Sequence, residues 1–131
     1  MRKDGLAMLV GLCIGVIVCN CLLKNLVART RPCDVNTAIQ LLISLPTDYS
    51  FPSGHTAASF TAVAALYFSG DKKIWKAAIV LGILIAFSRM YLYVHYPTDI
   101  LGGALIGNFS GFVGAKIVCY IMKKRKMKQI I

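Results

Sequence analysis

The sequence has few acidic residues and no arrangement of cysteines that would form a disulfide framework. Its 131 residues include five Asp and Glu against 15 Lys and Arg, which gives a formal net charge of +10. The basic residues flank apolar runs instead of lining one polar face, so we expect no nucleic-acid partner. The five cysteines lie mostly inside apolar runs, where they act as small packing residues. A set of metal ligands is missing as well, and we expect neither a metal nor a cofactor.

Long apolar runs fill most of the chain. Hydrophobic residues make up 57% of it and the mean hydropathy is +0.68, values typical of a membrane protein and not of a soluble core. The length leaves room for one domain, residues 1–131. We therefore predict an all-α fold, an integral membrane bundle of helices.

Four transmembrane helices are expected. Residues 6–23 form an uncharged run of 18 residues, and no signal-peptide cleavage site follows it, so we expect this span to be retained. The other expected spans are 56–68, 77–94 and 100–122. The second is short, but a helix that begins in a polar recess below the membrane surface needs fewer residues. A further helix at 37–45, apolar on nearly all sides, is expected to lie in the interface as a loop helix.

The basic residues predict the orientation of the bundle. With four spans, both termini share a side with the turn at 70–76, and that side carries eleven basic residues against four on the other. Because basic residues concentrate on the cytoplasmic side, we expect cytoplasmic termini in the cell membrane. Loops 24–55 and 89–99 would then face the extracytoplasmic side.

Ionisable side chains interrupt the apolar pattern at these outer loops. Inside a bilayer each one costs several kcal/mol unless it is paired or meets water, so such a cluster indicates a functional site. The chain order brings together Lys24, Arg31, His55, Arg89, His95 and Asp99. We interpret this set as one site assembled from three separate stretches of the chain.

The cations and the helix start in this set suit a phosphoryl group. Lys24, Arg31 and Arg89 would neutralise its oxygens, which is the main service that a protein renders in phosphoryl transfer. Ser53 is a good cap for the helix that follows it. Gly54 would expose backbone N–H groups at the positive end of that helix.

The two histidines and the aspartate supply the chemistry. Pro97 fits the first position of a helix, which leaves His95 just outside the helix and puts Asp99 in its first turn. Asp99 could then accept the proton of one imidazole nitrogen and leave the other nitrogen of His95 free to attack phosphorus. His55 would protonate the leaving oxygen and later activate water.

The chain resembles the type 2 phosphatidic acid phosphatases, the membrane branch of a superfamily that includes vanadium haloperoxidases and bacterial acid phosphatases. Three motifs carry the resemblance: Lys24, six residues, then Arg31-Pro32; Pro52-Ser53-Gly54-His55; and Ser88-Arg89, five residues, His95, three residues, Asp99. It implies a phosphohistidine mechanism with the roles just given, in which Ser53 and Gly54 complete the phosphate cradle. Members of the family have six helices, so this chain looks shortened by the first two. Either a homodimer supplies the missing contacts or the chain is a shortened member.

Our leading hypothesis is a metal-independent lipid phosphate phosphatase that acts on a lipid phosphomonoester or diphosphate in the membrane, with undecaprenyl diphosphate as the first candidate. Phosphatidylglycerophosphate and phosphatidic acid are alternative substrates. Two hypotheses of other classes stay open: a haloperoxidase that holds vanadate in the same cradle, and a non-catalytic small membrane assembly protein.

Overall fold

The computed structural model describes residues 2–70 and 72–128, and within those residues every regular element is helical. The all-α prediction is therefore confirmed. In chain order the elements are α1 (Arg2–Val16), the π-helix η1 (Ile17–Leu23), α2 (Lys24–Val27), α3 (Pro32–Val35), α4 (Gly54–Ser69), α5 (Ile74–Tyr91) and α6 (Pro97–Lys128).

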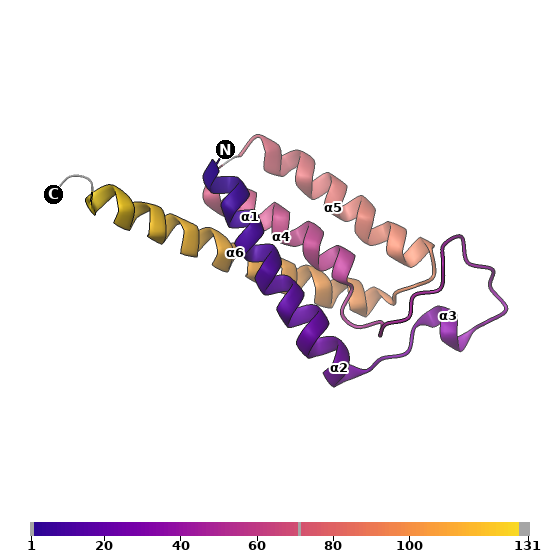
Figure 1. The fold of residues 1–131 in the computed structure, drawn as a ribbon. Coiled ribbons are helices and arrows are strands. Elements are labelled where there is room, and N and C mark those ends of the chain that lie inside the picture. The colour runs from indigo at the N-terminus through magenta and orange to yellow at the C-terminus, as the bar shows by residue number, and fades with distance from the viewer. Residues whose placement is uncertain (1, 71, 129–131) are drawn as a thin grey trace.

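The long helices lie side by side, and each runs opposite to the one before it (Figure 1). Helix α4 is central: it packs against α6, α1 and α5, whereas α5 contacts α6 only slightly. The start of α1, the α4–α5 turn and the end of α6 lie at one end of the bundle. The loop that follows α2 and the α5–α6 loop lie at the opposite end, where the polar residues of the three motifs are found.

Glycines on α6 allow the central helices to approach closely. A Cβ atom added at Gly103, Gly107 or Gly111 would fall less than 3.0 Å from a backbone oxygen of α4 or its cap, and one at Gly114 would meet α1 in the same way. Close backbone approach of this kind is how helices associate in membranes. The glycines at 103, 107 and 111, spaced four apart on α6, thus form the face that packs on α4.

Three segments of the described chain are long and apolar enough to cross a membrane: Lys3–Val35, Ile74–Tyr91 and Pro97–Lys128. This differs from the four spans predicted. The missing one is α4, whose 16 residues correspond to about 24 Å of helix, less than the hydrocarbon thickness of about 30 Å. It is surrounded by the other helices, which reach further than it does.

The prediction of an interfacial helix at 37–45 is wrong. This segment forms turns and bends, and the only helix in the loop is α3, which ends at Val35. A nine-residue helix is marginal without a surface to pack on, and Leu42 and Leu45 are 76% and 59% exposed here. By contrast, α3 has Pro32 at its first position, and the Asp34 carboxylate accepts a hydrogen bond from the backbone N–H of Arg31. Local capping therefore explains where α3 forms.

Candidate active site

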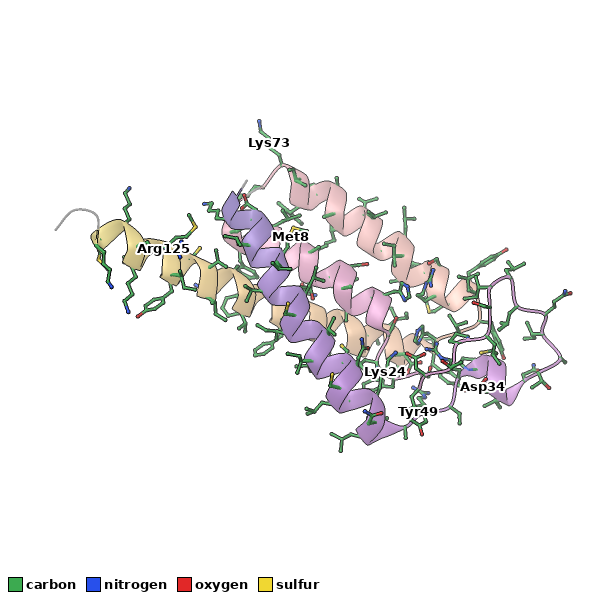
Figure 2. All side chains as sticks on the ribbon, in the orientation of Figure 1. Met8, Lys24, Asp34, Tyr49, Lys73 and Arg125 are labelled. Atoms are coloured by element: carbon green, nitrogen blue, oxygen red, sulfur yellow. The ribbon has the colours of Figure 1, made fainter. Side chains whose placement is uncertain are left out.

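A cavity of about 520 Å³ opens at the loop end of the bundle. It is lined by side chains of η1 and α2, the long loop, the start of α4, the end of α5 and the α5–α6 loop: Asn20, Lys24, Arg31, Ile43, Ser44, Pro46, Asp48, Gly54, His55, Ala58, Arg89, Val94 and His95. Figure 2 shows Lys24 at this end, and Lys73 and Arg125 at the opposite end of the molecule. Six of the eight residues expected in the site therefore line one cavity. The exceptions are Ser53 and Asp99, which lie behind its wall.

The π-helix η1 delivers Lys24 to the cavity. The backbone N–H of Lys24 bonds to the carbonyl of Cys19, five residues earlier, so the helix is wider here than an α-helix. This widening turns the following side chains about the helix axis, and π-turns of this kind are frequent at functional sites. Lys24 is 8% exposed, and its ammonium forms an ion pair with the Asp48 carboxylate. Nothing in the apolar run predicted the wider turn.

Arg31 joins the first motif to the α5–α6 loop and to Asp48 of the long loop. It is 3% exposed, and its Nη1 donates to the carbonyl of Val94 at 2.8 Å and lies 3.3 Å from Nε2 of His95. Its Nε and Nη2 donate to Asp48, at 2.9 Å to the backbone oxygen and 2.6 Å to Oδ1. A planar guanidinium suits such multiple contacts because its donors point in fixed directions.

His95 lies in the α5–α6 loop, as expected from Pro97 at the start of α6, but its hydrogen bond to Asp99 is absent. Its Nδ1 is 3.6 Å from Oδ2 of Asp99, too far for a hydrogen bond, and Nδ1 is a buried atom without a partner. The oxygens of Asp99 are occupied by other donors. Oδ2 accepts from the backbone N–H of Tyr96 at 2.8 Å and from the hydroxyl of Ser50, and Oδ1 accepts from Nη1 of Arg29 at 2.9 Å.

Arg29, Asp48 and Ser50 are site residues that sequence reasoning missed. Arg29 also stacks on the ring of Tyr96, 4.0 Å from its centroid, and donates to Thr98. Arg29 lies between Lys24 and Arg31 in the first motif, and a second arginine there could have suggested a partner for Asp99. Asp48 and Ser50 come from a loop without periodicity, and nothing in their sequence context indicated contact with the motifs.

The start of α4 matches its prediction in part. Ser53 is the N-cap, fully buried, and its hydroxyl accepts from the backbone N–H and the hydroxyl of Thr56 at 3.4 and 3.0 Å. Because that hydroxyl faces the helix, Ser53 supports the cavity from behind and does not line it. Gly54 and His55 do line it, and His55 is exposed.

The buried position of His95 determines its charge. Burial, and next the Arg31 cation, lower the pKa of His95 from 6.5 to about 4, although the Asp99 carboxylate opposes this change. The imidazole is therefore neutral at pH 7. Since a guanidinium can only donate, its contact with Nε2 puts the lone pair of His95 on Nε2 and the proton on Nδ1, facing Asp99.

The chain belongs to the PAP2 superfamily, whose family model matches residues 4–126. It is 32% identical over 116 residues to an undecaprenyl-diphosphatase of Sulfolobus acidocaldarius, covering 88% of this chain and 56% of that protein. Aquifex aeolicus LpxE has a similar solved structure, with a TM-score of 0.75 and 30% identity over 88% of this chain and 69% of that one. A phosphatidylglycerolphosphate phosphatase of Bacillus subtilis gives a TM-score of 0.66 and 29% identity, over 92% and 60%.

The chain spans about half the length of the curated relatives that it matches. The solved neighbours include a transmembrane phosphatase, and with its three long apolar helices this chain is an integral membrane protein.

Proposed function

We propose that this protein is a lipid phosphate phosphatase that works through a phosphohistidine, with undecaprenyl diphosphate as its first substrate. The observation that carries the proposal is the cavity itself. A buried, neutral histidine with its lone pair beside Arg31 shares that cavity with Lys24, Arg89 and His55. A substrate whose transferred group is a phosphoryl anion fits both this charge and this nucleophile.

In the proposed first step, Nε2 of His95 attacks phosphorus while the bond from phosphorus to the leaving oxygen breaks. His55 gives its proton to that oxygen, and the three cations of the cavity bind the remaining oxygens of the phosphoryl group. The imidazole gains positive charge as the N–P bond forms, and the Asp99 carboxylate, 3.6 Å from Nδ1, stabilises that charge. This separation should shorten in the reacting complex, because catalytic hydrogen bonds are often long in unliganded sites. Water then gives a proton to His55 and attacks phosphorus, the N–P bond breaks, and phosphate leaves with the lone pair of Nε2 of His95 restored.

Asp99 is held for this role by Arg29 and Ser50, in addition to the backbone of Tyr96. We propose that these residues position the carboxylate and do not touch substrate. They also stabilise an anion that is fully buried and would otherwise be costly.

Lipid contact is supported by the loop between α3 and α4. Ile43 and Pro46 line the cavity, while Leu42 and Leu45 project from the same loop and are exposed. We propose that this loop receives the lipid chain beside the phosphate site, even though it is not helical. The basic side chains Lys73 and Arg125 lie at the far end (Figure 2), which supports cytoplasmic termini and an extracytoplasmic site.

A phosphate-release assay on the purified protein in detergent tests the function and the substrate together. We expect hydrolysis in EDTA and inhibition by vanadate, because cations of the chain and not a metal bind the phosphoryl oxygens in this mechanism. kcat/KM should be highest for undecaprenyl diphosphate, lower for shorter isoprenyl diphosphates and lowest for phosphatidylglycerophosphate and phosphatidic acid. Preference for a diacyl phosphate would change the substrate, and preference for a soluble ester would remove the lipid assignment. Activity lost in EDTA and restored by Mg²⁺ would contradict the mechanism.

The pH profile tests the environment of His95. We expect the acid limb of kcat/KM near pH 4, not near 6.5, because the lone pair of His95 persists until protonation near its lowered pKa. As the pH falls through that value, the imidazole is protonated and the rate is lost. The Arg31→Gln variant removes one cause of the lowered pKa but leaves burial, so its acid limb should move upward and stay below 6.5. A wild-type limb near 6.5 would be inconsistent with a buried nucleophile.

A further inference from the structure

Asp48 places a carboxylate on the two most buried cations of the cavity. Its Oδ1 accepts from Nη2 of Arg31 at 2.6 Å and its Oδ2 pairs with Nζ of Lys24. The side chain of Asp48 is 52% exposed, whereas those of Lys24 and Arg31 are 10% and 4% exposed. Asp48 lines the cavity and is the most exposed of these three side chains, so its carboxylate is the one that meets solvent.

These two cations need an anion when no substrate is present. Unpaired buried charges are strongly destabilising, and the loop supplies the charge that compensates them. Partial burial raises the pKa of Asp48, but the hydrogen bonds and charges of Lys24 and Arg31 together outweigh it, so the pKa is lowered and the carboxylate is ionised at neutral pH.

A phosphate group would require the same donors. Nη2 of Arg31 and Nζ of Lys24 are directed at Asp48, while Nη1 of Arg31 is engaged by Val94 and His95. A phosphoryl oxygen can bind Nη2 of Arg31 at this position only by taking the place of Oδ1 of Asp48. The Lys24 ammonium has three N–H groups, so at Lys24 the two anions compete by charge and not for a single donor. Two anions on these donors would also repel each other.

We propose that Asp48 is a built-in counterion, which the phosphate group of the substrate displaces from Lys24 and Arg31 and which returns when product phosphate leaves. This inference rests on the proposed function, and it adds a residue that sets the affinity of the site for phosphate. Only protein molecules in which the carboxylate has moved away can bind phosphate. The apparent dissociation constant for phosphate is therefore the intrinsic constant divided by the fraction of such molecules.

The Asp48→Asn variant tests the competition. It keeps the size of the side chain and removes its charge, so the inhibition constants of vanadate and inorganic phosphate should fall by at least about fivefold with a short isoprenyl diphosphate as substrate. Asp34→Asn is the matched control, since Asp34 is an exposed carboxylate of α3 that does not line the cavity, and the asparagine oxygen can still accept from the backbone N–H of Arg31. Its inhibition constants should equal those of the wild type. Unchanged or raised constants in Asp48→Asn would overturn the proposal and make Asp48 a residue that positions the cations.

Thermal unfolding gives a second measurement that needs no turnover. Without its counterion Asp48→Asn should unfold at a lower temperature than the wild type, and inorganic phosphate should raise its unfolding temperature by more than it raises that of the wild type. Asp48→Ala should behave in the same way. If both variants fail to fold even with phosphate or vanadate present, the anion does not replace the carboxylate and the proposal is wrong. If the wild type hydrolyses no lipid, the proposed function fails, while these shifts still decide the role of Asp48.

Discussion

Replacing His95 by alanine should lower kcat by about 10⁴-fold or more, since loss of a nucleophile removes the covalent route altogether. The change should also abolish the acid-labile phosphoenzyme that is trapped when radiolabelled substrate is quenched in acid. Because His95 is buried and contacts Arg31, the unfolding temperature of the variant is measured beside its activity, so that loss of the nucleophile is distinguished from loss of the fold.

The control for this variant is Asn25→Ala, which changes an exposed residue of α2 whose side chain bonds to the carbonyl of Cys21. It should match the wild type in turnover and in unfolding temperature. His95→Gln keeps a side chain in the cavity wall and should be as inactive as His95→Ala. Near-normal turnover in either His95 variant would show that another group attacks phosphorus.

The spacing of the motifs predicted which residues meet but not how they bond. Pro97 starts α6 as expected, and the backbone of Tyr96 bonds to Asp99 in its first turn. That local geometry depends on a few neighbouring residues, which sequence patterns describe well. The other partners of Asp99 were not predicted, because Arg29 and Ser50 reach it across about 70 and 50 positions of the chain. Such contacts are set by tertiary packing.

The same difference between local interactions and tertiary packing explains which helices the sequence predicted. Long apolar runs predicted α1, α5 and α6 because burial and helix length act over many residues. The π-helix η1 and the loop at 37–45 depend on what surrounds them. No sequence signal indicated the π-helix, and the apolar residues at 37–45 predicted a helix that does not form. The irregular chain that continues from this segment brings Asp48 to Arg31 and Ser50 to Asp99.

Replacing His55 by alanine should reduce kcat by about 10²- to 10⁴-fold, the usual contribution of general acid–base catalysis. The reduction should depend on the leaving group. A lipid alcohol leaves poorly without a proton, so phosphatidic acid should suffer the larger loss. An isoprenyl diphosphate expels a stabilised phosphate oxygen and should suffer less.

Loss of His55 should also impair the second step, because water would then lack its base. With p-nitrophenyl phosphate, whose leaving group needs no proton, we expect a burst of p-nitrophenol followed by slow turnover, and accumulation of the phosphoenzyme on His95. Ser59→Ala is the matched control one turn further along α4: its hydroxyl bonds to the carbonyl of His55, and its loss should change neither the burst nor the steady rate. Equal losses for alcohol and phosphate leaving groups, without a burst, would indicate that His55 only binds the phosphoryl group. In that case His95 would still be the nucleophile, but His55 would not be the general acid and base of the reaction.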